Sequence, residues 1–165
     1  MKYTDFYRQI YKILGRLTPL DVDCGKLCDG ACCKGDDETG MYLFPGEKHM
    51  YAGEKNWLQI EKSDFEYDGR HADILICTTA CRRERRPLAC RIFPLLPYVT
   101  KEGELEIIFD PRGKYLCPLA KAMYIEDLNP QFVRKVKKVG QIMMKIPGMR
   151  KYLTELSRIA DEYIL

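Results

Sequence analysis

The apolar positions of this chain follow helical spacing near both ends and form short strand-like runs in between. Apolar residues recur every three or four positions from 3 to 17, and Pro19 follows as a stop signal. In the last third of the chain, Pro130 marks a helix start, an apolar stripe covers 132–143, and Pro147 opens another helix. The pattern predicts one N-terminal helix and two C-terminal helices.

The middle of the chain predicts strands, because short apolar runs are bounded there by Gly, Pro and Asp. An apolar segment at 41–44 is followed by a helical turn that Pro45 begins. The strand candidates are 57–60, 65–67, 74–77 and 105–109. We expect an α+β fold, predominantly helical, in which 1–165 form a single domain with a small antiparallel sheet and irregular Cys-rich loops around a metal site.

Hydrophobicity and charge exclude some classes of function. No apolar run approaches the 18 to 20 residues, roughly, that cross a bilayer, so we expect a protein that does not span membranes. A net charge of +3 is small for a nucleic-acid binder, and the basic stretch 134–151 has no aromatic platform beside it. These features disfavour nucleic acid and leave a protein partner, bound through the basic C-terminal helices, as the expectation.

Eight cysteines in 165 residues are the strongest chemical signal in the chain. An even number permits a disulfide framework, which is the main alternative. Charged residues interrupt the first seventeen positions, however, so no secretory signal is evident and we expect a cytoplasmic protein with reduced thiols. The resulting candidate metal ligands are Cys24, Cys28, Cys32, Cys33, Cys77, Cys81, Cys90 and Cys117.

Thiolates are soft, anionic ligands, and four of them complete a tetrahedral zinc shell or hold an iron–sulfur cluster. Eight thiols fit two such sites or one site with additional cysteines, and the sequence leaves both counts open. The negative charge of a thiolate shell favours a nearby guanidinium, and we assign this role in cofactor binding to Arg91. For Arg82, Arg83 and Arg85 we expect a solvated helix face.

Two segments resemble a known family. The stretch CGKLCDGACC at 24–33 is similar to a widened CxxCxxCC signature of the YkgJ-like cysteine-cluster family, a zinc- or iron-chelating domain. The stretch from Cys81 to Pro94, in which a cysteine is followed nine positions later by Cys90 in the context RPLACRIFP, resembles that family's second signature. The resemblance covers roughly residues 24 to 95 and implies the ligand role for the cysteines that match these signatures, namely Cys24, Cys28, Cys32, Cys33, Cys81 and Cys90.

Two cysteines lie less securely within the pattern. Cys77 ends an apolar run and is equally well explained as a buried core thiol. Cys117 precedes a proline, and we favour it as a ligand by analogy with the cysteine-proline ligands of iron–sulfur clusters. The expected function is metal binding with a structural or redox role. The alternative is an S-adenosylmethionine-dependent protein lysine N-methylase, because such enzymes resemble the same family, and whether the chain is an enzyme stays open.

Overall fold

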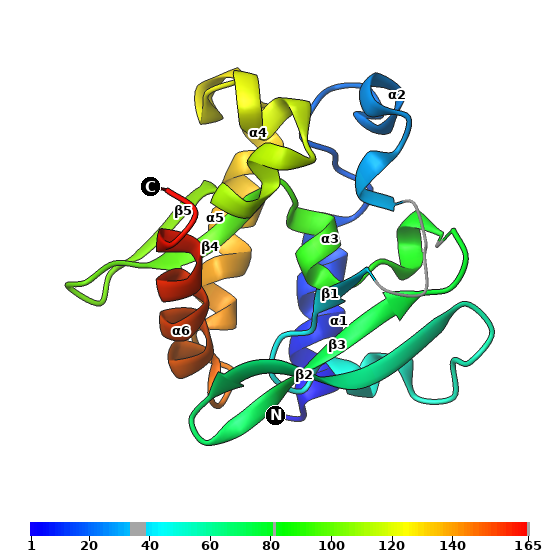
Figure 1. Cartoon of the computed structure of the whole chain (residues 1–165), viewed down its shortest axis with the longest axis vertical. Helices are drawn as coiled ribbons and strands as arrows, with labels where there is room; N and C mark the ends of the chain where they lie inside the picture. Colours follow the sequence, from blue (N-terminus) through cyan, green and yellow to red (C-terminus); the bar gives the residue numbers. More distant parts are fainter. Residues whose placement is uncertain (34–38, 81, 165) are drawn as a thin grey trace.

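Three amphipathic helices form the scaffold in the computed structural model, which describes residues 1–33, 39–80 and 82–164 (Figure 1). They are α1 (Tyr3–Leu14), α5 (Pro130–Met143) and α6 (Met149–Asp161), as the apolar spacing predicts. The side chain of Asn129 accepts hydrogen bonds from the first turn of α5, which confirms the predicted helix start. Helix α1 ends three residues earlier than expected, because Gly15 has a φ of 55° and leaves the helical conformation.

The described residues form two antiparallel sheets. The first has the order β1-β3-β2 and contains β1 (Gly40–Tyr42), β2 (Leu58–Tyr67) and β3 (Arg70–Cys77). The second pairs β4 (Leu95–Val99) with β5 (Leu105–Phe109). The two short strands predicted at the start and end of β2 belong to one long strand, because the register shifts in its middle without ending the pairing.

Strand β4 is absent from the sequence-based prediction because Pro97 lies at its centre. In the structure Pro97 pairs with Ile107. The hydrogen bond from the Asp110 amide to the Pro94 carbonyl marks a bonded position three residues before Pro97. Bonded and non-bonded pairs alternate in an antiparallel ladder, so Pro97 occupies a non-bonded position where its missing N–H costs nothing.

Short helical elements connect these parts and carry most of the cysteines. Figure 1 shows α2 and α4 at one end of the molecule, away from β2 and the N-terminus. The elements are α2 (Gly25–Cys28), η1 (Ala31–Cys33), η2 (Glu47–Tyr51), η3 (Arg83–Arg85), α3 (Leu88–Ile92), η4 (Pro111–Tyr115), α4 (Pro118–Ala122) and η5 (Ile125–Asp127).

The main hydrophobic core lies between α1, α5, α6 and β4, and it is centred on aromatic packing around Tyr152. The ring of Tyr152 lies 5.4 Å from that of Phe44, 5.0 Å from Phe65 and 4.9 Å from Tyr67. These tilted and edge-to-face contacts join α6 to β2. No helix in the described part of the chain has the length and apolar character that a bilayer crossing requires.

The hydroxyl of Tyr152 is buried and has no hydrogen-bond partner among the described residues. Because an unsatisfied buried hydroxyl is unfavourable, we predict that Tyr152→Phe raises the free energy of unfolding by about 1 kcal/mol. Tyr7→Phe is the matched control, since the Tyr7 hydroxyl donates to the Pro45 carbonyl at 2.8 Å and its loss should cost about 1 kcal/mol. Urea denaturation measures both values, and destabilisation by Tyr152→Phe would contradict this interpretation of the core.

Candidate metal centre

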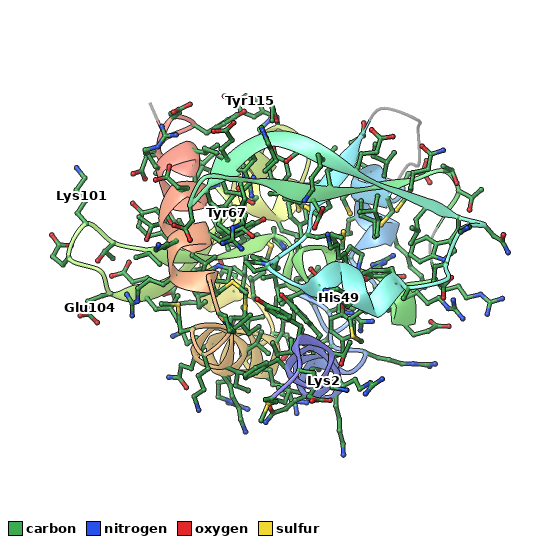
Figure 2. The ribbon with its side chains drawn as sticks, turned by 90° about the horizontal axis from the view of Figure 1, so that it is seen from below. Lys2, His49, Tyr67, Lys101, Glu104 and Tyr115 are labelled. Atoms are coloured by element: carbon green, nitrogen blue, oxygen red, sulfur yellow. The ribbon has the colours of Figure 1, made fainter. Side chains whose placement is uncertain are left out.

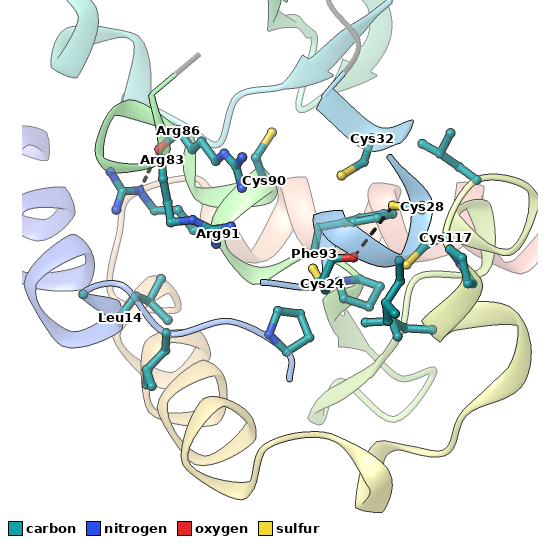
Figure 3. Close-up of a pocket in the computed structure, with 18 residues that line it drawn as sticks. Leu14, Cys24, Cys28, Cys32, Arg83, Arg86, Cys90, Arg91, Phe93 and Cys117 are labelled. Atoms are coloured by element: carbon teal, nitrogen blue, oxygen red, sulfur yellow. Dashed lines mark hydrogen bonds between the residues drawn. The ribbon is translucent and has the colours of Figure 1, made fainter. Parts of the chain in front are cut away.

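One small cavity gathers five of the eight cysteines (Figure 3). Its volume is about 50 Å³. Three separate segments of the chain supply the thiols: the α2–η1 region, α3 and the start of α4. The cysteines that line the cavity are Cys24, Cys28, Cys32, Cys90 and Cys117. The fold therefore brings together sulfur atoms from positions more than ninety residues apart in the sequence.

The first segment is a single helical turn followed by a reversal of the chain. Cys24 caps the N-terminus of α2 and Cys28 ends it, so the three-residue spacer between them places both on one side of the turn. Asp29 and Gly30 then adopt positive φ values of 50° and 62°, which turn the chain back. This reversal brings Cys32 to the same cavity.

The other two segments use prolines to begin short helices at the cavity. Pro87 precedes α3, whose middle residue is Cys90. Cys117 caps the N-terminus of α4, where Pro118 occupies the first turn, and its amide donates to the Gly113 carbonyl at 2.8 Å. Both cysteines therefore lie on backbone that local interactions hold in place.

The thiols of different segments influence one another electrostatically. Cys24 is half-buried, and burial raises the pKa of its thiol above the usual range. The nearby thiols of Cys32 and Cys117 raise this pKa further, whereas the guanidinium of Arg83 lowers it. A cation in the cavity would reverse this balance, because it stabilises thiolates.

Three arginines line the same cavity, Arg83, Arg86 and Arg91, and Figure 3 shows them on the side of Cys90. Arg91 donates from Nε to the Arg86 carbonyl at 2.6 Å, and its guanidinium carbon lies 4.0 Å from the centre of the Tyr11 ring. The structure thus places Arg91 at the cavity that we consider as the metal centre, while its role in cofactor binding stays a prediction.

Only one arginine of η3 departs from the solvated face that the sequence suggests. Arg83 is part of the cavity wall and pairs with Asp23 at 2.7 Å, and Arg85 pairs with Glu54. Arg82 remains exposed. Arg85 is exposed as well, as expected, so the expectation was wrong for Arg83 alone, because this segment forms one short 3-10 turn between other elements rather than one side of a long surface helix.

The remaining cysteines lie elsewhere or outside the described residues. Cys33 lines a neighbouring surface hollow together with Cys24 and Cys32, and its Sγ lies 3.9 Å from that of Cys32. Cys77 ends β3 and packs against the smaller apolar cluster, which contains Leu58 and Leu75, as its alternative interpretation as a core thiol requires. Cys81 lies outside the described residues.

The thiols at the cavity are the ligand type that a soft metal prefers, but in the described residues their positions do not form a metal-binding group. No disulfide joins two cysteines within the described ranges. Among those same residues, no three Cys, His, Asp or Glu side chains are grouped so that they could hold a metal ion. Helix α2 and turn η1 contain no buried residue, however, so little packing opposes a shift of their thiols toward the cavity.

Comparisons with protein-family models, curated proteins and solved structures found no match. The resemblance to the YkgJ-like family therefore stays a prediction, as does the methylase alternative that depends on it.

Sequence reasoning missed the side chain that joins two cysteine-bearing segments. Asp23 accepts a hydrogen bond from the Gly25 amide at 3.1 Å and pairs with Arg83. These contacts lower the pKa of Asp23, the Gly25 hydrogen bond most and Arg83 next. An aspartate just before a helical turn is a recognisable cap, but its pairing with an arginine sixty positions away is not visible in the sequence.

We predict that Asp23→Ala loosens this segment in the metal-free protein. Amide exchange across 25–30 should accelerate about fivefold, since losing roughly 1 kcal/mol of local stability corresponds to that factor. Because the pKa of Asp23 is lowered, its contacts are fully present above the ordinary aspartate range. They are lost as pH falls through the lowered pKa of Asp23, and the difference from wild type should vanish there. Asp68→Ala, which removes an exposed ion pair with Lys151, is the control. Equal acceleration of amide exchange across residues 25–30 in both variants would contradict the prediction.

Proposed function

We propose that this protein binds zinc or an iron–sulfur cluster through cysteine thiolates at the cavity, with a structural or redox role. One observation carries the proposal: five cysteines from three distant segments line a single cavity together with three arginines. Cysteines that serve only as small apolar core residues are not expected to collect around one cavity. The proposal requires a reducing compartment such as the cytoplasm, because thiols must stay reduced to bind metal.

The charges around the cavity support this assignment. Four thiolates around Zn²⁺ carry a net charge of about minus two, and an oxidised cubane cluster with four thiolates carries the same charge. Arg83, Arg86 and Arg91 supply the compensating positive charge at the cavity wall. When bound, the metal or cluster provides either a cross-link between the three segments or a centre that accepts and releases one electron.

The lining of the cavity favours a structural or redox role over hydrolysis. Besides the thiols and arginines, the wall consists mainly of apolar side chains, among them Leu14, Leu17, Phe93 and Leu119. A catalytic zinc keeps a position open for water, whereas an all-thiolate shell in apolar surroundings is closed. No observation on the described residues favours the methylase alternative.

We predict that serine variants separate the cavity cysteines from the others. Cys32→Ser and Cys90→Ser should each lower the metal content of anaerobically purified protein by at least about half, because a hydroxyl is a poor ligand for a soft metal. Cys77→Ser should retain the wild-type content, since Cys77 packs against the smaller apolar cluster. Elemental analysis with a sulfide assay measures these contents. Unchanged metal in both cavity variants would contradict the proposed site.

Two further observations on the same samples separate the two roles. A structural metal predicts that a chelator lowers the melting temperature. A redox cluster predicts reversible bleaching by dithionite.

A protein partner for the centre is also part of the proposal, and a basic face is its support. Helices α1 and α5 pack side by side, and Figure 2 shows them nearly end-on at the lower edge of the view, opposite β2 and β3. Exposed cations on these helices and in the residues just after them include Arg8, Lys12, Arg16, Arg134, Lys138 and Lys145. Within the described residues, Arg8 alone of these six forms an ion pair, with Asp5. Such a face is complementary to an acidic protein.

Charge reversal on α5 tests this face. The triple variant Arg134→Glu, Lys138→Glu, Lys145→Glu should weaken binding of poly-glutamate about tenfold at low salt, because each exposed charge contributes roughly 0.5 kcal/mol. The control reverses three exposed lysines elsewhere, Lys101, Lys114 and Lys121. Fluorescence anisotropy measures the dissociation constants. Equal weakening of poly-glutamate binding in both triple variants would refute the role of this face as the binding surface. Tighter binding of a DNA duplex than of poly-glutamate would point to nucleic acid as the partner.

A further inference from the structure

A fully buried carboxylate contacts the start of the helix that carries Cys90 and takes no part in the donor set. Glu47 in η2 is completely inaccessible to solvent. It accepts hydrogen bonds from the Tyr11 hydroxyl at 2.6 Å, the Leu88 amide at 2.6 Å and the Phe44 amide at 3.1 Å. Burial raises the pKa of Glu47, and these hydrogen bonds oppose that shift.

Two of the three donors connect Glu47 to the cavity. Leu88 is the first residue of α3, the helix that carries Cys90 and Arg91. Tyr11 presents its ring to the Arg91 guanidinium, whose carbon lies 4.0 Å from the ring centre. The carboxylate therefore holds both the start of the helix and the aromatic surface on which the guanidinium rests.

A second tyrosine closes the network from the other side. The Tyr51 hydroxyl lies 3.3 Å from that of Tyr11 and donates to the Arg85 carbonyl at 3.2 Å. Elements α1, η2, η3 and α3 are thus joined through polar atoms around Glu47. Gly46 permits this closeness, because it has a φ of 77° and a Cβ there would clash with the ring of Tyr3.

Stability alone is a poor explanation for this arrangement. Removing a charge from water costs several kcal/mol, and apolar side chains of similar size commonly serve a core equally well. Tyr7 illustrates the simpler case, since it is fully buried on the same helix as Tyr11 and its hydroxyl donates to the Pro45 carbonyl. The network at Glu47 instead connects polar groups to the wall of the cavity.

We propose that Glu47 and Tyr11 are positioning residues of the metal centre, which place the guanidinium of Arg91 and the helix of Cys90 at the cavity. This inference rests on the proposed function. Neither side chain lines the cavity, and each acts through α3. Groups that orient the surroundings of metal ligands commonly change metal affinity tenfold to a hundredfold, roughly, when they are lost.

The test compares two tyrosine variants of α1 that each remove a single hydroxyl group. Co²⁺ is the probe, and its absorption bands report both the affinity and the symmetry of a thiolate site. Tyr11→Phe should weaken Co²⁺ binding about tenfold and shift the bands, and Glu47→Gln should do so by at least as much. Tyr7→Phe should stay within about twofold of wild type with unchanged bands, because it leaves α3 untouched. Tyr11→Leu, which also removes the aromatic ring, should weaken Co²⁺ binding more than Tyr11→Phe does.

The outcomes separate this inference from the proposed function. If wild type binds Co²⁺ but Tyr11→Phe and Glu47→Gln match it, the positioning role is wrong and the metal centre stands. If Tyr7→Phe shifts the bands as much as Tyr11→Phe, the network is merely structural. If wild type binds neither Co²⁺ nor, on anaerobic reconstitution, an iron–sulfur cluster, both proposals fail together. If Glu47→Gln does not fold, the comparison of Co²⁺ binding by Tyr11→Phe and Tyr7→Phe decides the question on its own.

Discussion

Thiols crowded around a small apolar cavity repel one another as soon as they ionise, and this constraint governs the site. Burial and the neighbouring thiols of Cys32 and Cys117 raise the pKa of Cys24, so the surroundings of this thiol oppose its ionisation. Arginines on the wall reduce the repulsion, but their charge stands at the edge of the cavity. A bound cation at the centre removes the repulsion directly. The surrounding elements are best understood as parts that hold these sulfurs and guanidinium groups in reach of one another.

Two kinds of support hold the cavity together. On one side, the loose segment around α2 is attached by Asp23, which bridges the Gly25 amide and Arg83. On the other side, α3 is held at its first residue by Glu47, which is itself fully buried. The first support is exposed and weak, and the second is buried and rigid. A site built this way lets one segment close over a ligand while the other provides a fixed wall.

Local sequence signals predict the scaffold well because they depend on nearby residues. The stripes of α5 and α6 and the cap at Asn129 are local, and the structure confirms them. Strand β4 escapes prediction because only its pairing with β5 reveals that Pro97 occupies a harmless position. The gathering of cysteines is predicted in part, since one helical turn brings Cys24 and Cys28 together, whereas Cys117 reaches the cavity through tertiary packing. Glu47 and Tyr11 lack any sequence signal, because their partners lie far along the chain.

X-ray absorption spectroscopy at the edge of the bound metal, on protein purified without oxygen, tests the central claim most directly. Thiolates that converge on a cation predict a first shell of about four sulfur atoms, at roughly 2.3 Å if the metal is zinc. An iron–sulfur cluster adds an iron–iron distance to the sulfur shell. A first shell dominated by nitrogen and oxygen, or a folded protein without bound metal, would contradict the account.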